Sequence, residues 1–153
     1  MQTITPFLWF NNNLEEAINF YAATFKDAKI TNISRQGPDG PAFMTNFEIQ
    51  GQEFMGLNGG PMYKFTEAVS FFISCDNQEE VDYLWERLSD GGEIQMCGWL
   101  KDKFGVSWQV IPKLLMTLMS DGNPAKSQAV MGAMMEMKKI ESSVLQAAFD
   151  GAS

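Results

Sequence analysis

An internal duplication constrains this chain more than any other feature of its sequence. Residues 7–25 align with residues 71–89, so that an aromatic segment at 7–10 falls on 71–74 and the acidic pair Glu15 and Glu16 falls on Glu79 and Glu80. A second alignment places residues 51–57 over residues 105–111. Self-similarity on this scale indicates two copies of one supersecondary unit, each with a hydrophobic face to bury.

Each copy has the pattern of a strand, a helix and three further strands. Helices are predicted after Asn13 and Asn77, because asparagine is a favoured N-cap and apolar residues follow at helical spacing. The remaining strands are predicted at 30–34, 43–49 and 53–57, and at 94–97, 98–101 and 107–111, with glycine-containing turns between them. The order βαβββ–βαβββ predicts an α+β fold.

The pattern changes after Pro112, where helices are predicted at 114–119, 124–140 and 142–149. We therefore expect one domain over residues 1–112, made of modules at about 1–60 and 61–112, and a helical extension over residues 113–153. Methionine is frequent in this extension and is expected to pack in a core or a dimer interface.

Charge and composition exclude several partners. The chain has 19 acidic and 11 basic residues, for a formal net charge of -8. Nucleic acids and anionic membranes bind clustered cations, so neither is expected as a partner. The sequence has no apolar run long enough to span a bilayer and no signal-like start, which makes a cytoplasmic location the expectation. There, Cys75 and Cys97 should be reduced thiols.

The chain contains no histidine. This excludes histidine-based acid–base catalysis, Ser–His and Cys–His nucleophile pairs, and every zinc site that needs imidazole. A thiolate of Cys97 would depend on a neighbouring cation such as Lys101 or Lys103.

Two segments carry a resemblance to a known family. The opening FLWFNNNLEEAINFY and the later QMCGWLKDKFGVSWQVIP, together with the doubled βαβββ pattern, resemble the PhnB-like family, also labelled 3-demethylubiquinone-9 3-methyltransferase. This family belongs to the vicinal oxygen chelate superfamily, with glyoxalase I and the bleomycin resistance proteins. The resemblance covers residues 2 to about 140 and implies a glyoxalase/bleomycin resistance-like domain, with a curled eight-stranded sheet around a cavity and helices outside. It also implies a homodimer.

The resemblance implies metal-ligand positions at Pro6, Met55, Ser70 and Gln109. Only Gln109 offers a reasonable oxygen ligand, whereas a hard divalent ion needs several carboxylates or imidazoles. We therefore expect no metal and no other cofactor. A methyl donor of the nucleotide type normally lies on a glycine-rich strand-to-helix turn, and Gly59 and Gly60 lead to a proline instead.

Six residues are candidates for the binding site. Gln109 stands at a former ligand position. Trp99 and Cys97 would share one face with Gln95 and Lys101 if their strand were continuous. Asn58 ends a strand. Strand alternation groups Phe10 with Pro6, and the repeat groups Phe72 with Ser70. The resemblance implies that these positions face the cavity. The alternative for these residues is a place in the core or in a turn, and the Asp102–Gly105 segment, similar to an Asp-x-x-Gly turn of the superfamily, is expected to be a hairpin turn.

Three functions are compatible with these observations. The leading hypothesis is a metal-free protein that binds a small, partly apolar molecule in the sheet cavity. The second is an enzyme, of the methyltransferase type that the family label names or of another metal-independent type. The third is a dimeric scaffold whose cavity is filled by side chains. The identity of the ligand does not follow from the sequence.

Overall fold

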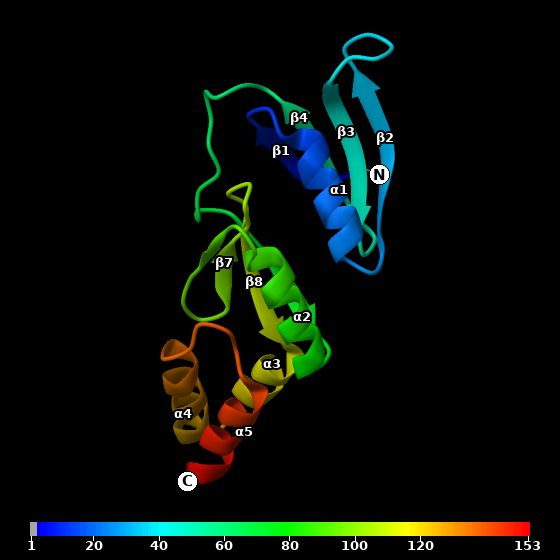
Figure 1. Ribbon diagram of the computed structural model, residues 1–153. Helices are drawn as coiled ribbons and strands as arrows, with labels where there is room; N and C mark the ends of the chain where they lie inside the picture. The colour runs from blue at the N-terminus through cyan, green and yellow to red at the C-terminus, as the bar shows by residue number, and fades with distance from the viewer. Residues whose placement is uncertain (1–2) are drawn as a thin grey trace. The chain divides into compact units, whose positions relative to one another are not determined.

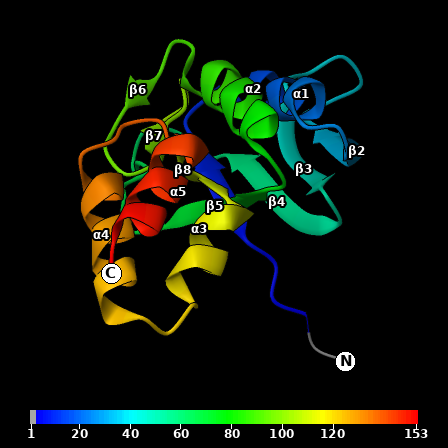
Figure 2. The same cartoon turned by 90° about the horizontal axis from the view of Figure 1, so that it is seen from below.

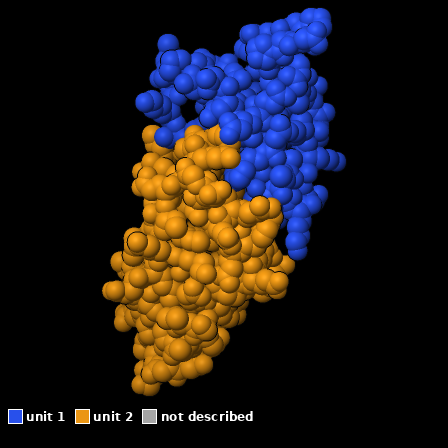
Figure 3. Space-filling view, viewed as in Figure 1, with its two compact units in different colours: residues 1–65 blue, residues 66–153 orange. Residues whose placement is uncertain are grey.

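A computed structural model describes residues 3–153 of the protein. The chain divides into two compact units, Met1–Phe65 and Thr66–Ser153 (Figure 3). The three C-terminal helices belong to the same unit as the second sheet. The division into a domain over residues 1–112 and a helical extension stays a prediction.

The first unit contains one βαβββ module (Figure 1). Its elements are β1 (Phe7–Phe10), α1 (Leu14–Thr24), β2 (Ala28–Arg35), β3 (Ala42–Ile49) and β4 (Gln52–Asn58). The strands form a four-stranded sheet in the order β1-β4-β3-β2. β1 runs parallel to β4, and the other two pairs are antiparallel.

One face of this sheet forms the core with α1. Leu8 and Phe10 of β1 and Phe54 of β4 are buried, as are Leu14, Ala17, Ile18 and Tyr21 of the helix. The rings of Tyr21 and Phe47 stack with centroids 6.2 Å apart. Because side chains alternate along a strand, Phe7, Trp9 and Met55 lie on the opposite face, which carries no helix of this unit.

The second unit repeats the same module. Its elements are β5 (Ser70–Cys75), α2 (Gln78–Ser89), β6 (Glu93–Ile94), β7 (Trp99–Lys101) and β8 (Ser107–Pro112), and the sheet order is β5-β8-β7-β6. β5 again runs parallel to β8. The doubled βαβββ order and the α+β class are thus confirmed. The eight strands form two sheets of four, and no closed barrel is present in the described residues.

The duplication has an offset that the sequence alignment did not reveal. The buried strand residues Leu8 and Phe10 correspond to the buried Ile73 and Cys75, so the strands align one residue later than the helices. The extra residue lies in the longer loop between β1 and α1. The predicted grouping of Phe10 with Phe72 is therefore wrong: Phe10 is 1% exposed in the core under α1, whereas Phe72 is 51% exposed on the face of its sheet opposite α2.

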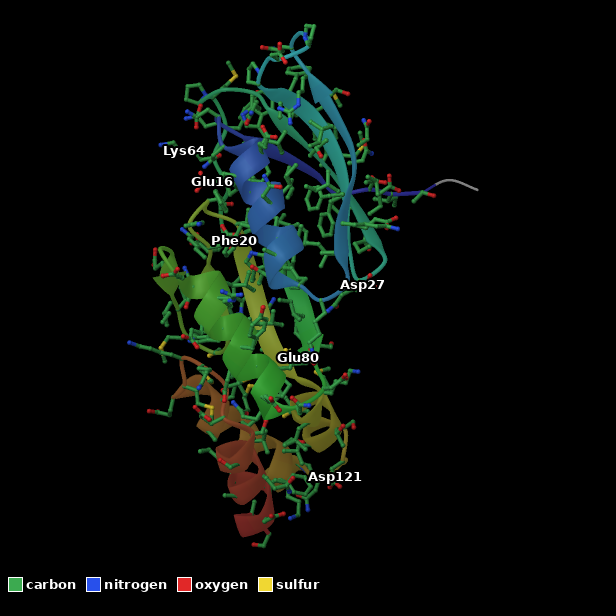
Figure 4. All side chains as sticks on the ribbon, turned by 45° about the vertical axis from the view of Figure 1, so that its right-hand side comes forward. Glu16, Phe20, Asp27, Lys64, Glu80 and Asp121 are labelled. Carbon is green, nitrogen blue, oxygen red and sulfur yellow. The ribbon has the colours of Figure 1, made fainter. Side chains whose placement is uncertain are left out.

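The two predicted helix caps have different outcomes. The side chain of Asn77 accepts a hydrogen bond from the backbone N–H of Glu80 at 2.9 Å, as predicted. Glu80 lies in the first turn of α2 (Figure 4). Asn13 precedes α1 but makes no side-chain cap hydrogen bond. Asn58 takes this role instead, because its Oδ1 accepts from the backbone N–H of Leu14 at 3.0 Å.

The strands predicted at 94–97 and 98–101 do not form one continuous strand. Cys97 and Gly98 have φ values of 60° and 82°, in the left-handed region, so the chain turns between β6 and β7. The expected alternation of Gln95 and Cys97 with Trp99 and Lys101 on one face is therefore wrong. Only Trp99 and Lys101 share a face, as the two ends of β7.

Three helices complete the second unit: α3 (Lys113–Met119), α4 (Pro124–Met135) and α5 (Ser142–Gly151) (Figure 2). The helix predicted to reach residue 140 ends at Met135. A buried cluster joins these helices to the end of β8 through Ile111, Leu115, Leu118, Val130, Ile140 and Leu145. Within the described part of the chain, every helix is too short or too polar to cross a lipid bilayer.

Candidate functional site

The face of the second sheet opposite α2 brings three of the six candidate residues into one row. Gln109 of β8 lies directly opposite Phe72 of β5 on one side and Trp99 of β7 on the other. Paired residues of adjacent strands project to the same face. The three side chains therefore form a line across the sheet, hereafter the Trp99–Gln109–Phe72 row.

The row combines two aromatic surfaces with one amide. Phe72 is exposed and Trp99 is half-buried, so both present ring surface on this face. The half-buried Gln109 donates a hydrogen bond from Nε2 to Oγ of Ser70 at 3.0 Å. This bond fixes the orientation of the amide, and the Gln109 carbonyl oxygen accepts no hydrogen bond from the described residues. It is available to a donor on a ligand.

Cys97 does not join this row, because it lies in the turn before β7. Its backbone N–H donates to the carbonyl of Met137 at 2.8 Å, and the N–H of Gly98 donates to the carbonyl of Lys138 at 2.8 Å. The turn is thereby tied to the segment between α4 and α5. The half-buried thiol of Cys97 and the buried thiol of Cys75 are both free.

The Cys75 thiol is chemically inert at neutral pH. Burial raises its pKa to about 12, with further contributions from the negative charges of Glu80 and Asp76. Only the thiolate is a good nucleophile, so this side chain acts as a core residue under α2.

Phe10 and Asn58 serve the structure of the first unit. Phe10 is buried, and its ring makes an edge contact with Phe65 at a centroid distance of 5.2 Å. Asn58 uses both ends of its amide: Oδ1 caps α1 at Leu14, and Nδ2 donates to the carbonyl of Ala42 at 3.0 Å. Neither side chain has a free polar group for a ligand.

Asp102 is a buried carboxylate whose importance the sequence did not reveal. It is 3% exposed; Oδ1 accepts from the backbone N–H of Phe104 at 2.9 Å and of Val106 at 3.0 Å, and Oδ2 accepts from Nε1 of Trp108 at 2.9 Å. The predicted hairpin turn is present. The Asp102 carboxylate closes the turn through the two backbone hydrogen bonds and fixes the orientation of the Trp108 indole through the third. The sequence signal for this buried carboxylate was the Asp-x-x-Gly segment Asp102–Gly105 followed by Trp108.

The residues at the positions implied for a metal do not fit a hard divalent ion. Pro6 and Met55 meet through a backbone hydrogen bond of 2.9 Å, and Ser70 and Gln109 meet through their side chains. Thioether, hydroxyl and amide groups supply no negative charge, which Mn²⁺ or Mg²⁺ requires of its protein ligands. Across residues 3–153, no three His, Cys, Asp or Glu side chains are grouped to hold a metal.

The strand-to-helix loops also differ from those that hold a nucleotide. The β1–α1 loop consists of three asparagines, and the β5–α2 loop is Asp76 and Asn77. A glycine-rich turn lets the backbone approach phosphates closely, and these loops lack that feature.

Two βαβββ modules, each with its first and last strand parallel, define the vicinal oxygen chelate fold. FosX, a fosfomycin resistance protein from Listeria monocytogenes whose structure contains Mn(II), shares this fold with a TM-score of 0.51 and 18% identity, over 71% of this chain and 89% of that chain. Protein PA1353 from Pseudomonas aeruginosa has a TM-score of 0.62 and 21% identity, over 73% and 98% of the two chains.

The sequence profile of the 3-demethylubiquinone-9 3-methyltransferase family matches residues 2–111, and the chain belongs to that family. A PhnB protein from Bacillus cereus is 36% identical, with a TM-score of 0.68, over 72% of this chain and 99% of that chain. No curated protein matches the sequence. The three C-terminal helices lie beyond the residues that the family profile matches.

Proposed function

We propose that the protein binds a small, partly apolar molecule on the face of its second sheet opposite α2. The observation that carries this proposal is the Trp99–Gln109–Phe72 row, which presents aromatic surface on either side of an oriented amide. Small-molecule sites are typically apolar surfaces with a few well-placed polar groups. The row has this composition.

We propose further that binding needs no metal ion. The support is the chemistry of the residues at the implied ligand positions, which are Pro6, Met55, Ser70 and Gln109 and include no carboxylate. The ligand would then be held by aromatic contact and hydrogen bonds alone. These residues give no support for a metal ion that would polarise a substrate as a Lewis acid.

The proposed working form is a cytoplasmic homodimer. One face of α4 is exposed and carries no charge: it consists of Ala125, Gln128, Met131, Gly132 and Met135. On a chain with net charge -8, such a face allows a second copy to approach without local repulsion. Light scattering should give twice the chain mass for the native protein, and M131K/M135K should give a monomer. An unchanged mass would reject this face as the interface.

An enzyme acting at the same row is the second candidate, favoured by the description of the family as a methyltransferase. Methyl transfer from S-adenosylmethionine to a catechol-type acceptor, lost in W99A, would establish this candidate. A ligand that binds the row and is not turned over would leave binding as the only function of this site.

The binding proposal is tested with a neutral apolar fluorophore, N-phenyl-1-naphthylamine. Saturable binding to the native protein is expected, and W99A should weaken it by about tenfold, equivalent to about 1.4 kcal/mol of lost aromatic contact. Q109A should weaken it by a smaller factor, whereas Q128A, which removes an exposed glutamine from α4, should not change it. Equal affinity in W99A and the native protein would contradict the proposed site.

A further inference from the structure

A second row of polar groups lies beside the Trp99–Gln109–Phe72 row on the same face. Ser107 of β8 lies directly opposite Ser70 of β5 and Lys101 of β7. These positions are two residues from Phe72, Gln109 and Trp99 along their strands, so their side chains project to the same side of the sheet. They form the Ser70–Ser107–Lys101 row.

Ser107 carries an unsatisfied hydrogen-bonding group. The residue is 1% exposed, and its Oγ makes no hydrogen bond with any described residue. Burial of a hydroxyl without a partner is unfavourable, and most such groups in proteins are satisfied by the protein, by water or by a ligand. An unsatisfied hydroxyl within a polar row indicates a partner outside the chain.

The neighbours of Ser107 are also hydrogen-bond donors. Oγ of Ser70 accepts from Nε2 of Gln109, which leaves the hydroxyl hydrogen of Ser70 free to donate elsewhere. Lys101 supplies an ammonium group whose side chain is 27% exposed. Two hydroxyls and one cation on adjacent strands match a group with several acceptor oxygens and negative charge.

A carboxylate of the chain itself already uses this row. Glu67, three residues before β5, forms an ion pair with Lys101. The hydrogen bond that the Lys101 ammonium donates to the Glu67 carboxylate raises the pKa of Lys101, so the ammonium remains charged throughout the neutral range. The row therefore accommodates a carboxylate at its Lys101 end.

From these contacts we infer that the ligand of this face carries a carboxylate, which binds the Ser70–Ser107–Lys101 row while its apolar part lies on Trp99 and Phe72. This inference rests on the proposed function and adds the class of ligand: a small apolar carboxylic acid in its ionised form. The two rows are adjacent on the same three strands, so one small molecule spans both. Glu67 competes with the ligand for Lys101.

The test compares two probes of nearly the same size and shape, the anion 2-naphthoate and the neutral 2-naphthamide, by isothermal titration calorimetry on the full chain. The native protein should bind the carboxylate at least about tenfold more tightly than the amide, since a charge-assisted hydrogen bond is stronger than a neutral one. K101M should abolish this preference by weakening carboxylate binding alone. K138M, which removes an exposed lysine of the same unit, should preserve it.

Two further variants give results that a purely structural role would not produce. S107A should leave the melting temperature equal or higher, because it removes an unpartnered buried group, yet it should weaken 2-naphthoate several-fold. E67Q should strengthen 2-naphthoate binding, because it removes the competing carboxylate. Lower affinity in E67Q, or unchanged affinity in S107A, would overturn the inference.

The outcomes separate this inference from the proposed function. Equal affinity for the acid and the amide, with both weakened by W99A, would overturn the carboxylate inference and retain the binding face. Failure of both naphthalene probes and of N-phenyl-1-naphthylamine to bind would overturn both. A preference for the acid that persists in K101M would reject the Ser70–Ser107–Lys101 row.

Discussion

The carboxylate of Asp102 should contribute more to the stability of the second module than any exposed acid of the chain. The substitution Asp102→Asn keeps the size of the side chain and removes its charge. One oxygen of the new amide can still accept from the N–H groups of Phe104 and Val106, now 2.9 and 3.0 Å from Oδ1. The amide nitrogen then faces Nε1 of Trp108, which is also a donor.

The expected loss follows from this geometry. The substitution removes the 2.9 Å hydrogen bond between Trp108 and the carboxylate and leaves a buried indole N–H without an acceptor. Hydrogen bonds to a charged group contribute about 1.5–3 kcal/mol, and an unsatisfied buried donor costs about 1–3 kcal/mol. Since the two terms overlap, we expect Asp102→Asn to lower the free energy of unfolding by about 2–4 kcal/mol.

Urea unfolding followed by far-ultraviolet circular dichroism measures this loss. Asp121→Asn is the matched control, because it makes the same chemical change at an exposed position between α3 and α4 (Figure 4). In a Trp108→Phe background, which lacks the indole N–H, Asp102→Asn should cost about 1–2 kcal/mol less. A loss within about 0.5 kcal/mol of the Asp121→Asn value would refute the assigned role of Asp102.

Three further predictions concern the thiols and the turn before β7. Because burial raises the pKa of Cys75 to about 12, a thiol reagent at pH 8 should label Cys97 in the native protein and Cys75 only after unfolding; equal rates would contradict this assignment. Because the folded state holds the Cys75 proton more tightly, this thiol stabilises the fold fully below the ordinary thiol pKa of 9.0, and the contribution should be lost as the pH rises from 9.0 toward 12. The unfolding free energy of a C75A variant should therefore depend less on pH in this alkaline range than that of the native protein. Gly98→Ala should destabilise more than Gly122→Ala by about 1–3 kcal/mol, because both have positive φ but only a Cβ at Gly98 would lie 2.7 Å from Cδ1 of Ile111; equal losses in calorimetry would exclude a packing role.

The sequence predicted the elements well wherever the pattern was local. The helices after Asn13 and Asn77 and the strands around Met55 and Gln109 lie where apolar periodicity placed them. These features depend on residues a few positions apart, which the alternation rules describe. The cap of α1 was missed because the acceptor, Asn58, is 44 residues away from Leu14 in the chain.

The errors in the candidate site have two physical causes. A single extra residue in the β1–α1 loop exchanges the two faces of β1, so the repeat placed Phe10 with Phe72, although Phe10 packs under the helix of its module and Phe72 lies on the face away from α2. Left-handed backbone at Cys97 and Gly98 breaks the strand that would have joined Cys97 to Trp99. Both errors arise where one residue changes the phase of the alternation.

The site residues that the structure brings together are those in regular strands. Gln109 and Trp99 were chosen from the sequence for their chemistry, and cross-strand pairing, which the sequence does not specify, places them side by side. The unsatisfied hydroxyl of Ser107 could not be predicted, because satisfaction of a polar group depends on every neighbour in the folded chain.

Native mass spectrometry of the gently purified protein measures directly whether the chain binds a small organic molecule without a metal ion. We expect an adduct of a few hundred daltons, or a metal-free apoprotein that takes up 2-naphthoate at one molecule per chain, with uptake lost in a W99A/Q109A variant. A stoichiometric divalent metal ion that remains bound to the native protein and to this variant would instead show that the protein is a metalloprotein.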